Sequence, residues 1–546
     1  MRFLLSLILS AGLLLTNNIS NAQFVPGALG YHEQALLFSN YNYNGSSRIQ
    51  GIGNAQISLG GDLSLALSNP AGLGFYNRSE FSITPAYNMA SANSLYIGNE
   101  TSSSSNTFGL NSLGAVFNRT KSDIAPGKYR GGSFAITFTK INNFNSEILY
   151  SGSNPNNDIL DFYVQDANIQ NLDPAELVGV TYGAYDTYLQ SEFLDAFIEN
   201  GDTTYVPFYD RTFFSEYPTD RFPTVQDEII SSSGSQNQWS FSYGGNYNDL
   251  IYFGATLGLQ SLRYNIAKVY TENYPGIEGD IVSNSILTEE LITEGFGVNG
   301  TFGVTARPIN QLTIGFSVIT PTYLSMNEKY YYSTEANFNN FNMQNYGNYF
   351  DANYEIIATN PSADFTTFYE STALLNNRTY NEESLFDYTI TTPLRLNAGT
   401  TFFISKHGFI TADVEFVDYS TMKLKDNEGF LAGDQMQINS VYKSVVNLRA
   451  GGEWRIKAFR LRAGYNYQPS PYQVDEIDRN IQTISAGLGF RSSKFFLDLA
   501  GSYKQFNSTY NPYTIENPDN ESYLNTHPVS IENTNLNIAL SFGLFF

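Results

Sequence analysis

The sequence contains no cysteine, which excludes disulfide bonds, thiolate metal sites and the lipid attachment of a lipoprotein. Charged side chains are also scarce: they make up 15% of the residues, whereas an ordinary soluble protein has about 25%. After the N-terminal region, no segment has the roughly 18 consecutive apolar residues that a transmembrane helix needs. An ordinary soluble protein and a helical membrane anchor are therefore both disfavoured, and strand pairing is expected to hold the fold together.

The N-terminus has the organisation of a secretory signal peptide. Arg2 precedes an apolar run from Phe3 to Leu15, and Ser20-Asn21-Ala22 supplies small residues for cleavage. We expect residues 1–22 to be removed, so that the mature chain begins at Gln23. The chain is therefore predicted to be exported.

Aromatic residues are abundant, with 40 tyrosines and 41 phenylalanines. The aromatic girdles of a transmembrane β-barrel account for such an excess. From Leu536 to Phe546 the chain is apolar at every even position, which is typical of the strand that closes a barrel. We expect the barrel-assembly machinery to recognise this strand through Phe546. A secreted β-sandwich or propeller is the alternative, but neither explains the closing strand.

Alternating apolar and polar residues predict about 14 strands, joined by alternately short and long connections. The strands are expected at residues 79–92, 108–118, 131–145, 237–247, 250–270, 294–306, 311–325, 388–405, 408–425, 444–456, 459–470, 480–491, 494–507 and 533–546. An even number of strands places both barrel ends on the periplasmic side, with the long loops outside. The predicted fold class is all-β: a transmembrane antiparallel β-barrel over residues 78–546, in the outer membrane of a Gram-negative bacterium.

Successive side chains of a strand point to opposite faces, so each strand has a lipid-facing and a lumen-facing set. The predicted lipid-facing residues include Leu312, Ile314, Phe316, Val318, Ile410, Ala412, Val414, Phe416, Leu461, Phe495, Leu497 and Leu499. The predicted lumen-facing residues are of mixed charge and include Arg395, Asp413, Glu415, Asn447, Arg449, Glu453, Arg460, Arg462, Asp498 and Lys504. Since the side chains of so wide a barrel cannot fill it, we expect another segment to occupy the lumen.

Residues 23–77, between the signal peptide and the first strand, are too many for a simple tail. They contain Gly51-Ile52-Gly53 and, directly before a strand, Asn69-Pro70-Ala71-Gly72. These segments resemble the N-terminal hatch of the FadL/TodX family of outer-membrane hydrophobic-compound transporters. The resemblance continues in Thr320-Pro321-Thr322-Tyr323, in the stretch 392–399 and in the stretch 461–471.

The resemblance implies a 14-stranded barrel plugged by a hatch, with long-chain fatty acids or other apolar molecules as ligands. Family members take up ligand passively at the outer surface and pass it inward after the hatch shifts, while a kinked strand opens a lateral exit. For this chain it implies a hatch role for Asn69, Pro70, Ala71 and Gly72, although Asn69-Pro70 can equally be a helix terminator. An accessory subunit of an outer-membrane secretion or assembly complex is the alternative function, and haem uptake is disfavoured because histidine ligands are scarce.

Three lumen arginines, Arg395, Arg449 and Arg462, are candidate contacts for a ligand headgroup. A guanidinium forms bidentate hydrogen bonds with a carboxylate, such as that of a fatty acid. Carboxylates are also predicted to face the lumen, so internal ion pairing is the favoured alternative.

A second set of candidate ligand contacts lies in the longest insertion, residues 146–236. Leu189, Phe193 and Phe197 share one face of a helix predicted over residues 186–201. Such a helix would form an apolar lid over the extracellular mouth. The alternative is a helix that only packs against neighbouring loops.

Other classes of function are disfavoured. The net charge of -23 argues against nucleic acid as a partner. With three histidines and no Gly-x-Ser-x-Gly elbow, we predict neither an enzyme nor a cofactor or metal site. The acidic insertion could bridge to lipopolysaccharide through divalent cations, but no Asp-x-Asp-x-Asp-Gly loop is present, so a solvated surface is favoured. The expected partners are an apolar small molecule, outer-membrane lipid and lipopolysaccharide, with a possible protein partner at the extracellular loops.

Overall fold

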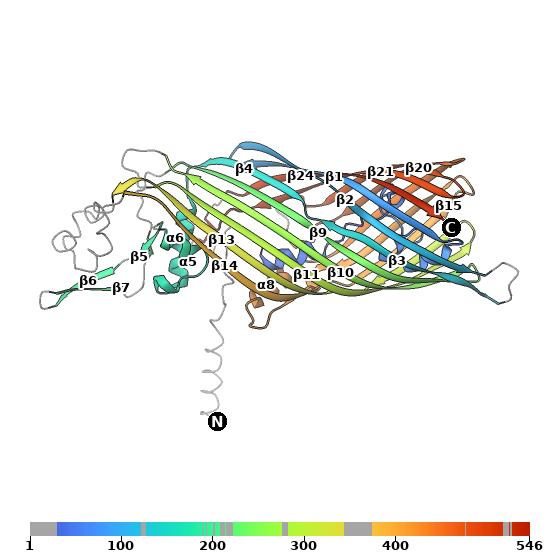
Figure 1. The fold of residues 1–546 in the computed structure, drawn as a ribbon, viewed down its shortest axis with the longest axis horizontal. Helices are drawn as coiled ribbons and strands as arrows, with labels where there is room; N and C mark the ends of the chain where they lie inside the picture. Colours follow the sequence, from blue (N-terminus) through green and yellow to red (C-terminus); the bar gives the residue numbers. More distant parts are fainter. Residues whose placement is uncertain are drawn as a thin grey trace, which may run out of the picture.

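The computed structural model describes residues 30–121, 127–187, 189–192, 194–199, 202–207, 213–214, 222–275, 282–342, 374–474, 477–516, 523–524 and 527–546. Over these residues the chain forms a closed antiparallel barrel of 14 strands (Figure 1). Strand β1 (Glu80–Tyr96) pairs with β2 (Asn99–Thr120) on one side and with the last strand, β24 (Val529–Phe545), on the other, which closes the barrel. The predicted fold class is confirmed.

The rest of the wall follows chain order. Its strands are β3 (Tyr129–Asn143) continued by β4 (Ser146–Asn154), β9 (Thr224–Tyr247), β10 (Ile251–Asn273), β11 (Val282–Ile309), β12 (Leu312–Ile319) continued by β13 (Tyr323–Asn342), β14 (Leu374–Thr391) continued by β15 (Arg395–Phe403), β16 (Gly408–Asp418) with β17 (Lys423–Lys425), β18 (Ser444–Ile456), β19 (Phe459–Gln468), β20 (Ile481–Arg491) and β21 (Phe495–Tyr510). Several strands begin earlier than predicted, for example β9 at Thr224 instead of residue 237. Their outer ends carry serine, threonine and asparagine, so the apolar alternation that reveals a strand is lost there.

Tight turns join the strands at the end of the barrel that also holds the C-terminus (Figure 1). Asn248 and Asp249, between β9 and β10, adopt left-handed conformations with φ of 59° and 56°, as does Lys457 between β18 and β19 with φ of 53°. Asparagine and aspartate tolerate this region better than most residues, which suits them to tight hairpins. These are the turns that the sequence predicts on the periplasmic side.

The outer surface of the barrel has an apolar band. Phe316, Ile410 and Leu497, all predicted to face lipid, are 55%, 57% and 42% exposed. On β9 the band runs from Tyr247 to Trp239, after which the next four outward residues are Asn237, Ser235, Ser233 and Ser231. That is about the length of strand that crosses an outer membrane, so β9 continues beyond the membrane on the extracellular side. The predicted outer-membrane location is confirmed.

Short helices lie inside the barrel and around its extracellular end. Those of the N-terminal segment are α2 (Tyr31–Ser39), α3 (Ser47–Gln50), α4 (Leu65–Ser68) and the 3-10 helix η1 (Pro70–Phe75), drawn in blue within the barrel in Figure 1. Outside are α5 (Ile159–Gln170), the 3-10 helix η2 (Pro174–Glu176), α6 (Val180–Asp186), the 3-10 helix η5 (Tyr419–Thr421) and α8 (Ala432–Val441). Within the described ranges, no helix has both the length and the apolar character needed to cross a bilayer.

Short hairpins complete the extracellular part. They pair β5 (Ser191–Glu192) with β8 (Phe213–Phe214), β6 (Leu194–Glu199) with β7 (Asp202–Pro207), and β22 (Ile515–Glu516) with β23 (Tyr523–Leu524).

Candidate functional site

The N-terminal segment, which we call the hatch and which is described from residue 30 to the start of β1, rests directly on the barrel wall. A Cβ atom added to Gly303 of β11 would lie 1.8 Å from Asn69 Oδ1, and one added to Gly464 of β19 would lie 2.1 Å from Gly53 N. Any side chain at these two wall positions would therefore collide with the hatch. Glycine permits the backbones to approach this closely.

Asn69 connects the end of α4 to the wall. Its Oδ1 accepts a hydrogen bond from Ala71 N at 3.2 Å, which caps η1. Its Nδ2 donates to Ile57 O at 2.6 Å and to Thr305 Oγ1 of β11 at 3.2 Å. Together with Pro70, Ala71 and Gly72, it is buried. The residue thus both terminates a helix and ties the hatch to the barrel.

Arg395 and Arg449 share a single carboxylate. Arg395 NH1 and Arg449 NH2 each lie 3.0 Å from Glu415 Oε1. The other oxygen, Glu415 Oε2, accepts a hydrogen bond from the hatch residue Tyr43 at 2.7 Å. The two guanidinium groups also stack on rings of the hatch, with Arg395 4.5 Å from the centre of Tyr41 and Arg449 4.6 Å from that of Tyr43. This geometry favours internal ion pairing for both arginines.

Arg462 is paired in the same way, nearer the periplasm. Its Nε lies 2.9 Å from Glu453 Oε2 and its NH1 lies 2.7 Å from Asp498 Oδ1. Arg48 of α3 reaches the same carboxylate, with Nε 3.8 Å from Glu453 Oε2, and lies 3.7 Å from Asp62. The positive charge of each lumen arginine is thus already balanced by a neighbouring carboxylate. A headgroup role for these arginines stays a prediction.

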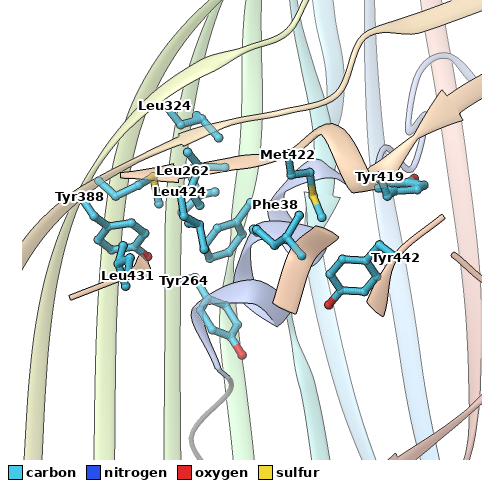
Figure 2. Close-up of a cluster of buried hydrophobic side chains, with 14 of the residues drawn as sticks. Phe38, Leu262, Tyr264, Leu324, Tyr388, Tyr419, Met422, Leu424, Leu431 and Tyr442 are labelled. Carbon is cyan, nitrogen blue, oxygen red and sulfur yellow. The ribbon is translucent and has the colours of Figure 1, made fainter. Parts of the chain in front are cut away.

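Above these pairs, α2 lies in an apolar cluster that fills part of the lumen (Figure 2). Phe38 is fully buried, and its ring centre lies 5.7 Å from those of Phe144 and Tyr264. This lumen cluster contains Ala35, Phe38, Phe144, Ile230, Leu262, Tyr264, Ile266, Leu291, Leu324, Met326, Tyr388, Ile390, Val417, Tyr419, Met422, Leu424, Leu431, Ile438, Tyr442 and Val445. Sequence reasoning missed α2, although the run Leu36-Leu37-Phe38 is an apolar signal within the hatch.

Two polar contacts fix α2 at its N-terminal end. His32 Nδ1 lies 3.2 Å from Asp434 Oδ1 of α8, and Tyr31 donates a hydrogen bond to Glu328 at 2.7 Å. At its C-terminal end Arg395 donates to Ser39 O. Helix α2 is therefore attached to the extracellular loop through α8 and to the barrel wall at both ends.

The barrel wall has a break between β2 and β3. These strands pair only from Thr120 opposite Gly131 to Ser112 opposite Thr139. A bulge then interrupts β3 between Lys140 and Asn142, and the ladder of β3 continues with β9 alone. A gap in the ladder, with its backbone groups unpaired across it, is a site where a barrel wall can part.

Side chains bridge the wall outside this break. On β2, Thr101 Oγ1 donates to Leu149 O of β4 at 2.6 Å, and Ser103 Oγ donates to Glu147 O at 2.6 Å. The two strands are thus joined there by side chain to carbonyl bonds. We call this contact the β2–β4 seam.

The hatch covers the break from inside. Asn44 forms an isolated antiparallel bridge with Lys140. Asn142 accepts from Asn42 Nδ2 at 2.9 Å and donates to Asn40 O at 2.6 Å. The hatch segment 40–44 therefore supplies hydrogen-bond partners where the wall lacks them.

The longest insertion differs from prediction. The helix predicted over residues 186–201 is wrong, because Leu194–Glu199 forms strand β6 of a hairpin with β7. Leu189 is buried beside α5 and α6, Phe197 lies on β6, and Phe193 lies outside the described residues. The helices of this insertion are instead α5 and α6, which precede the predicted helix and overlap it only at Asp186.

Two buried carboxylates lie at the extracellular end of the wall, and one of them, Glu272, anchors α5. Glu272 of β10 accepts from Ile159 N, the first residue of α5, at 3.0 Å and from Gln226 Nε2 at 2.6 Å. Burial and the nearby Asp158 raise the pKa of Glu272 above its usual value. Glu228 of β9 accepts from Tyr150 at 2.6 Å, and burial raises its pKa to about 7.

The histidines and acidic side chains do not assemble a metal centre in the described part of the chain. His32 contacts Asp434, His407 stacks on Trp454 in a periplasmic turn, and His527 lies 3.2 Å from Asn156 outside the membrane. Among the described residues, no group of three or more histidine, aspartate or glutamate side chains is placed to hold a metal ion.

Comparison with solved structures identifies the architecture. No protein-family model matches the sequence, and no curated protein matches it. A FadL homologue from Pseudomonas aeruginosa is 12% identical, with a TM-score of 0.52, and the match covers 92% of this chain and 98% of that one. The toluene transporter TodX from P. putida is 12% identical, with a TM-score of 0.51, covering 92% and 99%. The chain therefore has the fold of the FadL and TodX outer-membrane barrels, and the resemblance seen in the sequence is confirmed at the level of fold.

Proposed function

We propose that this protein is a passive outer-membrane channel for hydrophobic compounds, with long-chain fatty acids among its candidate ligands. One observation carries the proposal: the break between β2 and β3 is closed by hatch residues and not by strand pairing. If the hatch segment 40–44 moves away from β3, the break in the wall is left open. In the proposed cycle the hatch shifts and an apolar ligand leaves sideways into the membrane.

The interior supports an apolar route to this break. The lumen cluster packs around Phe38 of the hatch, and aromatic residues such as Tyr332 and Tyr513 form a second apolar cluster with α5 and α6. Burial of apolar surface is the main driving force for capturing such a ligand. Helix α2 occupies the lumen cluster, so in this proposal ligand enters by displacing Phe38.

The solved structures with a similar fold support the same function. A FadL homologue and a toluene transporter share the fold, and transport of an apolar compound is what the name of the latter states. In this proposal Asn69, Pro70, Ala71 and Gly72 form the anchored base of the hatch. Leu189 belongs to the lid formed with α5 and α6, and Phe193 and Phe197 are proposed lid residues as well.

A disulfide between the hatch and the wall tests the proposal. The chain has no cysteine, so Asn44→Cys with Lys140→Cys introduces a single pair at the bridge between hatch and β3. In outer-membrane vesicles we expect oxidation to abolish uptake of a labelled fatty acid and a reductant to restore it. Uptake that continues at its full rate after the disulfide has formed would contradict hatch movement at the break.

A matched control places a disulfide within the wall. Thr401 of β15 and Thr411 of β16 face each other in the lumen, with their hydroxyl oxygens 2.9 Å apart. Thr401→Cys with Thr411→Cys cross-links two strands that are already paired. This variant is expected to transport at the wild-type rate whether it is oxidised or reduced.

The second candidate function is an accessory subunit of a secretion or assembly complex. It is favoured by the extracellular body that β13, β14, α5 and α6 form far from the periplasmic end (Figure 1). Mass spectrometry of the gently extracted protein distinguishes the two candidates. A stoichiometric fatty acid or hydrocarbon would favour transport, whereas an empty barrel recovered with a stable partner would favour the subunit role.

A further inference from the structure

The turns at the periplasmic end are rich in basic residues, although the chain as a whole has a net charge of -23. These turns, with their flanking strand residues, are 119–130, 247–251, 306–311, 403–408, 455–460 and 491–495. Their acidic residues are Asp249 and Asp123, the latter outside the described residues. Their exposed basic residues, which we call the basic ring, are Arg119, Lys121, Lys128, Lys406, Lys457 and Lys494. The acidic excess of the chain therefore lies outside the periplasmic turns.

The described part of the chain does not neutralise these charges. Asp249 is already paired, with its Oδ2 3.8 Å from Arg130 Nε. Among the described residues, no carboxylate oxygen lies within 4.0 Å of the ammonium groups of Lys406, Lys457 and Lys494. Exposed cations of one sign attract an anionic partner from outside the chain.

The basic ring surrounds the barrel. Lys128 lies between β2 and β3, Lys406 between β15 and β16, and Lys494 between β20 and β21. Because the wall follows chain order, the first two of these lie on roughly opposite sides of the barrel. Where the barrel closes, Arg78 adds a further cation, 3.5 Å from the ring centre of Phe545. A protein that docks on one side needs a patch, whereas a membrane leaflet contacts a barrel on every side.

The basic ring directly borders the apolar band. Lys457 lies between Ile456 and Phe459, which are 50% and 60% exposed, and Lys494 precedes the exposed Phe495. A strand rises about 3.3 Å per residue, so these lysines begin within about 7 Å of the band. The headgroup region on each side of a bilayer is about 5–7 Å thick. The ammonium groups are therefore at the depth of the headgroups, and their stems can lie along the apolar surface.

We propose that the basic ring binds the headgroups of anionic phospholipids in the periplasmic leaflet. Any barrel in a membrane contacts lipid, and the ring adds selection for headgroup charge at one of the two leaflets. The lysines donate charge-assisted hydrogen bonds to phosphate oxygens, and an anionic leaflet attracts basic residues that lie beside it. This binding is independent of the compound that the barrel transports.

Lipid titration of the purified full-length barrel tests the ring. The probes are dioleoylphosphatidylglycerol, which is anionic, and dioleoylphosphatidylethanolamine, which is zwitterionic and has the same acyl chains. Native mass spectrometry measures how much of each lipid stays bound to the wild type and to a variant with Lys406→Gln, Lys457→Gln and Lys494→Gln. We expect the wild type to prefer the anionic lipid. The variant should bind that lipid at least about tenfold more weakly and the zwitterionic lipid as the wild type does.

Two controls separate charge from position, each in protein shown to be folded by heat-modifiable migration. Arginine at the same three positions should keep the preference for the anionic lipid. Lys329→Gln with Lys423→Gln and Lys425→Gln removes the same charge from β13 and β17 at the extracellular end, and should bind both lipids as the wild type does. Equal binding of the two lipids by the wild type, or an unchanged preference in the glutamine variant of the ring, would overturn the proposal. Equal lipid binding together with binding of soluble poly-glutamate would replace it with an acidic soluble partner.

Discussion

At the scale of single residues, the lumen is held by charges that are already paired. Glu415 forms ion pairs with Arg395 and Arg449 and accepts a hydrogen bond from Tyr43. Glu453 forms ion pairs with Arg462 and Arg48. In both cases a wall carboxylate connects wall arginines to the hatch. The predicted lumen faces of these strands are confirmed, because alternation alone determines which side a strand residue faces.

Removing Arg462 should affect stability and not ligand affinity. Arg462→Ala leaves the buried Asp498 without the cation that pairs with it and removes one of the cations around Glu453, which typically costs about 3–5 kcal/mol. We expect the barrel to unfold at lower temperature or denaturant concentration, while the affinity for hexadecanoic acid stays that of the wild type. A selective loss of acid affinity with an unchanged unfolding midpoint would restore the headgroup role predicted for this arginine.

At the scale of elements, glycines of the wall allow the hatch to approach closely, in addition to the side-chain contacts that join the two. Gly464 of β19 meets the backbone at Gly53, and Gly303 of β11 meets Asn69. This contact could not be read from the sequence, because a glycine in a strand pattern indicates either a bulge or a close approach. The partner backbone lies hundreds of positions away in the chain.

Adding a side chain at Gly464 should displace the hatch from the barrel wall. In the Gly464→Val variant the new side chain would overlap Gly53, so we expect a higher ion conductance in planar bilayers than for the wild type. Gly501→Val is the matched control, since nothing lies within 4 Å of a Cβ at that glycine of β21. Equal conductance of the two variants would show that the hatch tolerates the collision.

The extracellular end of the barrel wall around Glu228 should open as pH rises, because Tyr150 of β4 and Tyr510 of β21 donate hydrogen bonds to this carboxylate. Burial raises the pKa of Glu228 from 4.5 to about 7, against the lowering effect of Lys268, and burial also raises that of Glu289. Because the closed state binds these protons more tightly, the stabilisation is fully present below pH 4.5 and is lost as pH rises through about 7.

Hydrogen exchange measures this effect. Amide protection across β4 is expected to be lower at pH 8 than at pH 5. Glu228→Gln, which keeps the hydrogen bonds from Tyr150 and Tyr510 available but cannot ionise, should reduce the difference. Protection that does not change between the two pH values in the wild type would contradict coupling between these carboxylates and the extracellular end of the wall.

At the scale of the whole molecule, strand order, facing and the presence of a segment inside the barrel are predictable, while the helices of that segment and of the extracellular insertion are not. The helix predicted over residues 186–201 fails because β7 pairs with β6, and a local apolar pattern does not reveal a pairing partner. Helix α2 is missed for a related reason. It is packed on several sides by wall strands and by α8, so it lacks the single apolar stripe of a surface helix. Lys504 lies in the lumen as predicted, but no carboxylate pairs with it among the described residues, which depends on strands that meet only in the fold.

The β2–β4 seam also gives the barrel a line of mechanical weakness. In a β-ladder a pulling force is distributed over consecutive backbone hydrogen bonds. The hydrogen bonds that Thr101 and Ser103 donate to β4 are separate side-chain contacts, so each can break on its own. When a single molecule is pulled from its extracellular end, we expect the first rupture to separate β2 from β4. Replacing both residues by alanine should lower that first rupture force and leave the later ones unchanged.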